Sequence, residues 1–123
     1  MDYFAEWLEK SGIKDTTINK HYRNVDFYIN EFLLYEEAIP AKEGASSVGM
    51  FLGYWFIRKA MWSSVAAIKQ NAASLKKFYQ FMLERNEIEV YEFEELKKTI
   101  KEDMPDWLNR MKRYDDIDIE DID

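Results

Sequence analysis

The sequence predicts an all-α protein, and three observations support this fold class. Only four Gly and two Pro occur among the 123 residues, so few positions interrupt a helix. Apolar residues recur at steps of three and four along nearly the whole chain, without sustained apolar/polar alternation. The length and the 47% apolar content suit one modest core. We therefore expect a single helical domain over residues 1–113 and an acidic, mobile tail over residues 114–123.

The first two predicted helices lie on either side of Gly12. One covers Asp2 to Lys10 and ends at this glycine. The other covers Thr17 to Glu37, with Asp15 or Thr16 as its cap. Apolar side chains at helical spacing form its core-facing stripe. These are Ile18, Tyr22, Val25, Ile29 and Phe32.

A third predicted helix follows the break at Pro40 and Gly44, with Ser46 or Ser47 as its cap. It is rich in large apolar residues, so we expect it to be mostly buried. Its inward positions are Val48, Phe51, Leu52, Trp55 and Phe56.

Ser63 and Ser64 offer hydroxyls to cap a fourth helix, which runs to about Arg85. Its inward stripe is Ile68, Ala72, Leu75, Phe78, Tyr79 and Met82. Trp62 precedes the cap and either closes the core or lies exposed beside a bound phosphate. We favour the core, because Trp is highly buried on average.

Two shorter helices are predicted after the fourth. A fifth element, "YEFEELKKTI", buries Phe93, Leu96 and Ile100. A sixth begins near Pro105, which suits a first-turn position, with apolar residues inward. These are Trp107, Leu108 and Met111.

Several classes of chemistry lack their characteristic residues. The sequence has no Cys and one His, so it predicts no disulfide, thiolate metal site or multi-histidine site, and His21 is expected to be structural or exposed. No phosphate-binding glycine loop or nucleophile elbow occurs. We predict no catalytic residue, metal, cofactor or small-molecule substrate, and hence no enzyme. No leader pattern or long apolar run is present, so we expect a cytoplasmic chain without a membrane partner.

Charge is distributed unevenly along the chain, whose net charge is -7. Residues 1–86 carry 11 basic and 10 acidic side chains, whereas residues 87–123 carry 6 and 14. Between Gly44 and Leu83 there are five Lys or Arg residues and no acid. Helix starts and nearby cations attract phosphate, although a solvated helix face explains the same pattern. The candidate contacts are Arg58, Lys59, Ser63, Ser64, Lys69 and Lys76.

Two segments carry a family resemblance. "DTTINKHYRNVDFYINEFL" and, about thirty residues on, "SSVAAIKQNAASLKKFYQFM" resemble the N-terminal core-binding, SAM-like domain of tyrosine recombinases (phage integrases). The match covers about Asp2 to Ile88. The positions that carry it are Thr17, Phe32, Ser64, Leu75, Lys76, Phe78 and Tyr79.

The resemblance implies a four-helix SAM-like bundle, here with one or two extra C-terminal helices, that forms half of a clamp on DNA in integration and recombination. It implies contacts to the major groove and to phosphates from the starts of the second and fourth helices. Those positions are Lys14, Thr16, Thr17 and Lys20, and Ser63, Ser64, Lys69 and Lys76. Only 35 residues follow Ile88, so the family's catalytic domain is missing and we expect no strand cleavage by this chain.

Two functions remain open at this point. The first is a non-catalytic domain that binds DNA, mainly through phosphates. The second is an interaction module whose acidic C-terminal third binds a basic partner, such as another recombinase chain, or masks its own basic face.

Overall fold

The computed structural model describes the backbone of residues 2–122 and, within this range, all side chains except those of residues 2, 36, 37 and 115–122. Its regular elements are all helical, and no strand occurs in the part of the chain that is described. The all-α prediction is therefore confirmed.

Helix α1 spans Asp2–Lys10, as predicted. It ends at Gly12, whose φ of 83° lies in the left-handed region that favours glycine. The Gly12 N–H donates to the Glu9 carbonyl at 3.0 Å, and the Ile13 N–H donates to the Leu8 carbonyl at 3.2 Å. These two bonds satisfy carbonyls that the helix end leaves free.

Helix α2 (Asp15–Phe27) continues into the π-helical segment η1 (Tyr28–Glu37). The predicted cap at Asp15 or Thr16 is wrong, because the helix begins at Asp15 and its N-cap is Lys14, which makes no side-chain cap bond. Asp15 therefore lies inside the first turn, where a carboxylate is favourable next to the helix N-terminus.

The third predicted helix is built from several short segments, and Ser47, one of its two predicted caps, does occupy the N-cap position. Ser47 has helical backbone angles, and its side chain makes no cap bond, because two 3₁₀ turns already lead into the helix. These turns are η2 (Ala41–Glu43) and η3 (Ala45–Ser47), and the helix itself consists of α3 (Val48–Met50), η4 (Phe51–Trp55) and α4 (Phe56–Lys59).

Aromatic rings join the two π-helical segments η1 and η4. The Phe32 ring lies 5.2 Å from that of Phe51 and 5.4 Å from that of Trp55, measured between centroids. Tyr28 meets Phe51 at 4.7 Å. Tyr28, Phe32 and Phe51 are almost fully buried and Trp55 is half-buried, so this ring cluster forms one end of the core.

Helix α5 (Val65–Glu84) is the central helix, and its predicted apolar stripe is buried throughout. Ser64 caps it as predicted, since its Oγ accepts a hydrogen bond from the Ala67 N–H at 3.0 Å. At the other end Asn86 adopts φ of 60°. Its N–H and that of Glu87 donate to the Leu83 and Met82 carbonyls, the same closure as in α1.

Helix α6 runs from Val90 to Ile122 with Pro105 inside it, so the prediction of separate fifth and sixth helices is wrong. The apolar positions on the two sides of Pro105 stay in phase, and their burial outweighs the local cost of a proline, about 3 kcal/mol. The buried positions are Phe93, Leu96, Ile100, Trp107 and Met111. The boundary predicted at residue 114 falls within this helix. The mobility predicted for residues 114–123 stays a prediction, because the side chains of residues 115–122 lie outside the described ones.

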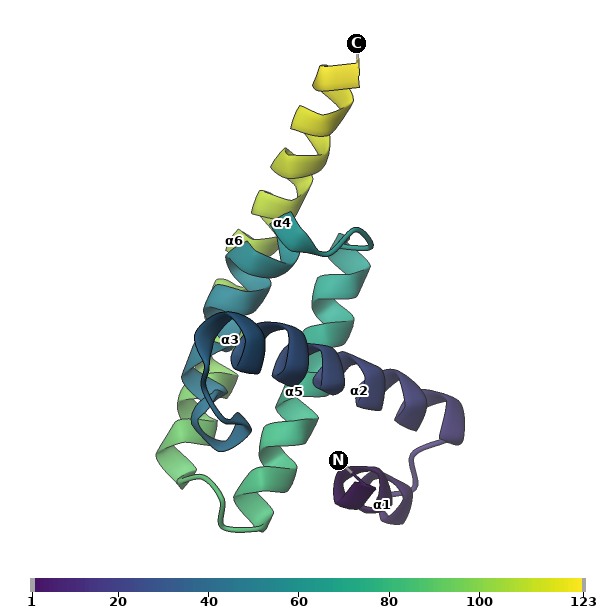
Figure 1. The fold of residues 1–123 in the computed structure, drawn as a ribbon, viewed down its shortest axis with the longest axis vertical. Coiled ribbons are helices and arrows are strands. Elements are labelled where there is room, and N and C mark those ends of the chain that lie inside the picture. The colour runs from purple at the N-terminus through teal and green to yellow at the C-terminus, as the bar shows by residue number, and fades with distance from the viewer. Residues whose placement is uncertain (1, 123) are drawn as a thin grey trace.

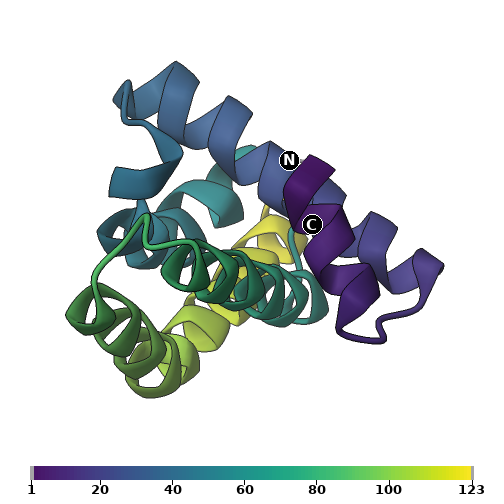
Figure 2. The ribbon, with the colours of Figure 1, turned by 90° about the horizontal axis from the view of Figure 1, so that it is seen from below.

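The helices pack around α5. In Figure 1, α2 crosses α5, and α6 runs antiparallel to α5 and extends beyond the other helices at its C-terminal end. Figure 2 shows α2 and η1 on one side of α5 and α6 on the other. Consequently the α4–α5 turn lies beside the second half of α6, whereas the start of α2 lies beside α1, away from that turn.

Candidate nucleic-acid interface

The structure divides the predicted DNA contacts among three places. The first is the start of α2, the second is the end of α4 with the turn to α5, and the third is the exposed face of α5. The members are Lys14, Thr16, Thr17 and Lys20 in the first place, Arg58, Lys59, Ser63 and Ser64 in the second, and Lys69 and Lys76 in the third.

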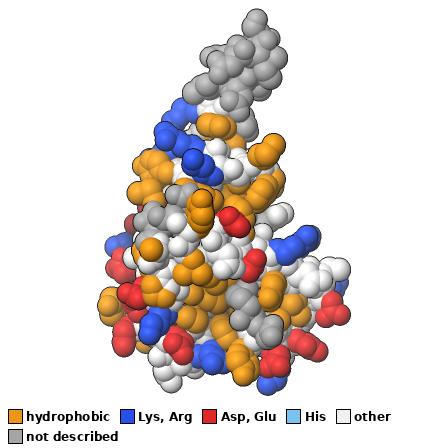
Figure 3. All heavy atoms as spheres, in the orientation of Figure 1, with side chains coloured by type: hydrophobic (Ala, Val, Ile, Leu, Met, Phe, Trp, Pro, Cys, Tyr) orange, Lys and Arg blue, Asp and Glu red, His pale blue; other side chains and the backbone are white. Residues whose placement is uncertain are grey.

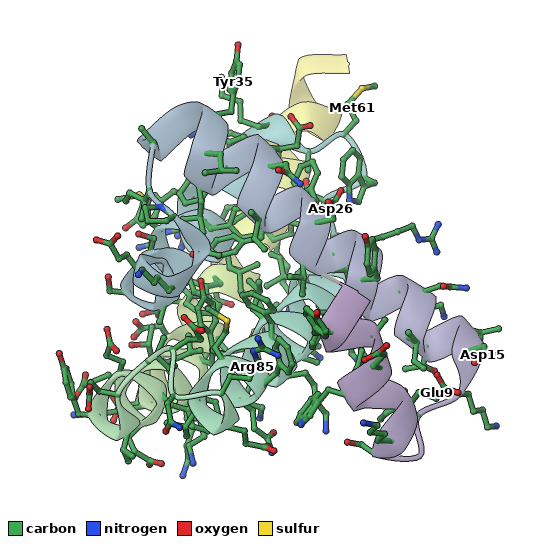
Figure 4. All side chains as sticks on the ribbon, turned by 60° about the horizontal axis from the view of Figure 1, so that its bottom comes forward. Glu9, Asp15, Asp26, Tyr35, Met61 and Arg85 are labelled. Atoms are coloured by element: carbon green, nitrogen blue, oxygen red, sulfur yellow. The ribbon has the colours of Figure 1, made fainter. Side chains whose placement is uncertain are left out.

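The start of α2 presents its predicted residues to solvent. Lys14, Thr16 and Lys20 are exposed, and Thr17 is half-buried. The acidic residue Asp15 stands between the first two and is also exposed. Figure 4 shows Asp15 and Glu9 at this same end of the molecule. The positive charge here is therefore diluted by carboxylates.

The serines of the α4–α5 turn have structural partners. Ser63 Oγ donates to the Ile57 carbonyl at 3.2 Å, which ties the turn to α4 and corrects the prediction that Ser63 also caps α5. The Ser64 oxygen is occupied by the Ala67 N–H, and the Ser64 hydroxyl proton has no acceptor among the described residues. Ser64 therefore retains one donor for a phosphate oxygen.

Lys69 and Lys76 are both exposed on α5. Their spacing of seven residues is nearly two full turns, so they share one face at an axial separation of about 10 Å. They add positive charge along the helix without converging on a single point.

Arg58 lies in a surface hollow between η4, α4 and α6. Two further arginines of α6, Arg110 and Arg113, line the same hollow, whose volume is about 280 Å³. We call it the arginine hollow; its lining includes Tyr54, Ile57, Arg58, Arg110, Arg113 and Tyr114, and no acid among the described residues. Cations more than fifty residues apart in the sequence therefore meet at one site.

Arg110 and Arg113 were missed by the sequence analysis. They belong to the C-terminal third, whose net negative charge concealed them. The signal that would have found them is local: Arg110, Arg113 and Tyr114 follow the apolar stripe of Trp107 and Met111 at helical spacing. Such spacing keeps them beside whatever element covers that stripe.

A stack with an aromatic ring holds one of these arginines in place. The Arg110 guanidinium carbon lies 4.2 Å from the centroid of the Tyr54 ring. A stacked guanidinium uses its flat face and leaves its N–H edge available to donate. Arg110 is therefore oriented without consuming its hydrogen-bond donors.

A second hollow of about 260 Å³ adjoins the first and shares Ile57, Arg58 and Tyr114 with it. Lys59, Met61 and Ser63 line its other side. Since the shared residues form the wall between the hollows, the two make one continuous cationic surface. In the space-filling view Lys and Arg side chains gather just below the end of α6, while acidic ones lie mainly on the lower half (Figure 3).

Among the described residues, the cations of this surface form no ion pair with a carboxylate of the protein. The ion pair between Lys97 Nζ and Glu94 Oε1 at 3.1 Å is the only one between side chains that the structure describes. Arg58, Lys59 and Arg113 have no ion pair or side-chain hydrogen bond among those residues. Acids reappear at the far side of Arg110, where Asp103 and Asp106 line a neighbouring hollow. That hollow marks the edge of the cationic surface.

Trp62 lies at the other edge of this surface, and the prediction that it closes the core is wrong. Its side chain is 57% exposed. One edge packs on the Phe27 ring at a centroid distance of 5.0 Å, because the α4–α5 turn carries Trp62 over the ends of the buried rings. It borders a hollow of about 390 Å³ with Arg23, Asp26 and Glu31, where the charges are mixed.

The remaining polar groups serve the fold. His21 Nδ1 lies 2.7 Å from Ser74 Oγ, and the Asn24 side-chain amide donates to the same oxygen at 3.0 Å. Burial first, and the nearby Lys77 second, lower the pKa of His21. Burial raises the pKa of Tyr79, whose hydroxyl donates to the Ala41 carbonyl at 2.9 Å. His21 thus has the structural role predicted for it.

Groups of three or more metal-ligating His, Asp or Glu side chains are absent from the described part of the chain. Within the same residues, no helix has the length and apolar character needed to cross a bilayer.

Comparisons with protein-family models, with curated protein sequences and with solved structures find no match to this chain. The resemblance to a recombinase core-binding domain therefore stays a prediction.

Proposed function

We propose that the chain is a non-catalytic DNA-binding domain, similar in role to the core-binding domain of tyrosine recombinases, which contacts DNA mainly through phosphates. One observation carries the proposal: the exposed Arg58 and Lys59 meet Arg110 and Arg113 on a surface whose hollows contain no acid and no ion pair among the described residues. Guanidinium groups bind phosphate bidentately. Four cations on one surface attract a polyanion despite the net charge of the chain, because binding depends on the local field.

Salt dependence tests this function. We expect the full chain to bind a labelled DNA duplex in fluorescence anisotropy, with an affinity that falls steeply as salt rises. Each phosphate contact contributes about 0.9 to the slope of log affinity against log salt. The double variant Arg58→Ala/Lys59→Ala should therefore lower the slope by about two and weaken all sequences evenly.

The matched control is Lys98→Ala/Lys101→Ala, which removes two exposed lysines from α6. It carries the same net charge as the test variant and should leave the slope almost unchanged. Equal slopes for the two variants would overturn the proposal. Absence of binding at low salt, even after deletion of residues 115–123, would overturn it as well.

A second function has its own observation. Helix α6 passes without interruption from Arg110 and Arg113 into the acidic segment, which carries six acids from Asp115 onward. This segment either competes with DNA for the cationic surface or engages a basic protein, such as another recombinase chain. Truncation after Tyr114 separates these cases. Higher DNA affinity indicates competition, whereas unchanged affinity excludes it and leaves the segment to a partner.

A further inference from the structure

The cationic surface also carries exposed aromatic and apolar side chains. Tyr54 is 46% exposed, although it holds Arg110 in a stack. Tyr114 forms part of the wall between the two hollows and is half-buried. At the α4–α5 turn Met61 is 98% exposed and Trp62 57%, and Figure 4 shows Met61 pointing away from the protein. Flat or apolar groups therefore accompany the cations along the whole surface.

The combination of rings and cations on adjoining hollows distinguishes this surface. The arginine hollow contains Tyr54, Arg110, Arg113 and Tyr114, and Arg58 connects it to the second hollow, which ends at Met61. Rings and cations therefore line the same surface. We call this surface the Tyr/Arg strip. A row of solvated charges needs no exposed rings, and a purely apolar docking surface needs no unpaired arginines.

The combination of rings and cations matches the chemistry of an unpaired nucleotide, which has a charged phosphate and a base with free faces. Proteins that bind single strands combine cations along the phosphate backbone with aromatic rings on which the bases stack. In a duplex the base faces are already stacked on one another, so a protein ring finds no free partner. The rings of the strip would therefore add no base stacking to duplex binding.

The size of the strip supports the same ligand class. Its two hollows measure about 280 and 260 Å³, at or below the lower limit of about 300 Å³ for pockets that enclose a whole small ligand. Each therefore accommodates a phosphate and part of its nucleotide, and the two adjoin along a line. This shape suits successive units of a strand better than an isolated cofactor.

We propose that the Tyr/Arg strip binds single-stranded nucleic acid, with phosphates held by Arg58, Arg110 and Arg113 and bases stacked on Tyr54 within the strip and on Trp62 at its edge. This inference rests on the proposed function, because Arg58 belongs to both. It adds two statements that phosphate binding does not require: a preference for single strands and a contribution from the rings.

The test compares three labelled probes with equal numbers of phosphates: an oligothymidylate, a hairpin duplex, and an abasic strand that lacks bases. We expect the full chain to bind the oligothymidylate most tightly. One base stack is worth about a 5- to 150-fold change in affinity, so the abasic strand should bind weaker by at least that factor.

The variant Tyr54→Leu keeps an apolar side chain but removes the ring, and Tyr54→Phe keeps the ring. We expect Tyr54→Leu to lose about 5-fold or more in affinity for the oligothymidylate, and to lose less for the duplex, where only the support of Arg110 by the ring is removed. Tyr54→Phe should bind like the wild type. Tyr91→Leu is the matched control, since Tyr91 is also exposed but lies in the first turn of α6. Thermal unfolding verifies that each variant is folded.

The outcomes separate the two proposals. Equal affinity for the oligothymidylate and the abasic strand, or equal losses on all three probes in Tyr54→Leu, overturns the single-strand inference and leaves phosphate binding intact. Duplex binding without single-strand binding does the same. Failure to bind any probe overturns both proposals.

Discussion

The start of α2 and the Tyr/Arg strip both contain cations that the sequence predicts to bind DNA, but only Arg58 and Lys59 of the strip's cations were predicted, and the two regions differ in how their charges are assembled. At the start of α2 the cations Lys14 and Lys20 come from one helix and flank Asp15, with Glu9 at the same end (Figure 4). In the strip, arginines of α4 and α6 line one hollow together, and no acid is among its described lining residues.

This difference shows that the attraction of a surface for phosphate depends on which charges the fold brings together there. Opposite charges closer than the Debye length, about 8 Å at physiological salt, cancel much of each other's field. Asp15 adjoins Lys14 in the sequence, so this cancellation is built into the start of α2. In the strip, tertiary packing brings together cations from two separate elements and leaves Asp103 and Asp106 to the neighbouring hollow beyond Arg110.

The largest effect should come from breaking that convergence without changing any charge. A Cβ at Gly53 would lie 2.7 Å from Trp107 Cδ1 and 3.4 Å from Arg110 Nη1. Because the Trp107 ring is buried, it cannot move aside without a cost in free energy, so Gly53→Ala should push α6 away from η4. We expect a loss of about 1–2 kcal/mol in the free energy of unfolding, since overpacking exceeds the gain in helix propensity. We also expect weaker DNA binding under conditions in which the variant is folded.

Gly12→Ala is the counterpart at the other region. A Cβ there meets nothing within 4 Å, but the φ of 83° is strained for Ala, which costs about 1 kcal/mol. Chemical denaturation should show both losses, while only Gly53→Ala should reduce DNA affinity. Equal DNA affinity in the two variants would contradict the importance of convergence.

A smaller effect on stability comes from the N-caps of α2 and α5, the helices that begin in the two regions. Ser64→Ala removes the hydroxyl that caps α5 and should cost about 1 kcal/mol of stability. Lys14→Ser supplies α2 with the cap it lacks and removes a cation from the helix N-terminus, so it should gain up to about 1 kcal/mol. Thermal unfolding measures both changes.

The Lys14→Ser variant also sharpens the comparison. If the start of α2 lies outside the interface, the salt slope of DNA binding should stay unchanged in this variant. A slope lowered by about 0.9 would mean that Lys14 contacts a phosphate, and would place the start of α2 in the interface.

Helix type and burial were predictable from the sequence because they depend on local periodicity. The inward stripe of α5 is buried at every predicted position, and the ends of α1 follow from Gly12. The predictions that failed concern positions where a local sequence signal favours one structure and tertiary packing favours another. Pro105 is a good first-turn residue, but the apolar stripe on both sides of it stays in phase, so one long helix buries more than two short ones.

The candidate site was only half predictable, for a related reason. Arg58 and Lys59 are apparent in an acid-free segment, whereas Arg110 and Arg113 are surrounded in the sequence by acids. Which acids share their surface depends on the packing of α6 against η4 and α4. Sequence periodicity indicates which face of α6 is buried, but it does not identify the element on which that face packs.

The smallest effect lies where α2 crosses α5, at the hydrogen bonds that fix the direction of α2. His21 lies beside Ser74, Asn24 and Lys77, and burial and the Lys77 charge lower its pKa below the ordinary value of 6.5. The unfolded chain then binds a proton at a higher pH than the folded chain does. Stability should therefore be complete above about pH 6.5 and should decline as the pH falls towards the lowered folded pKa.

Substitution of His21 isolates this effect, because the chain contains no other histidine. His21→Asn keeps a polar group near Ser74 but does not titrate. The difference in unfolding free energy between wild type and variant, measured by urea denaturation, should shift against the wild type between pH 7 and pH 5. The shift should be small, since the ring is only half-buried. A difference that stays constant, or moves in favour of the wild type, would show that the crossing does not disfavour the charged imidazole, and the direction of α2 would then have to be attributed to its apolar contacts alone.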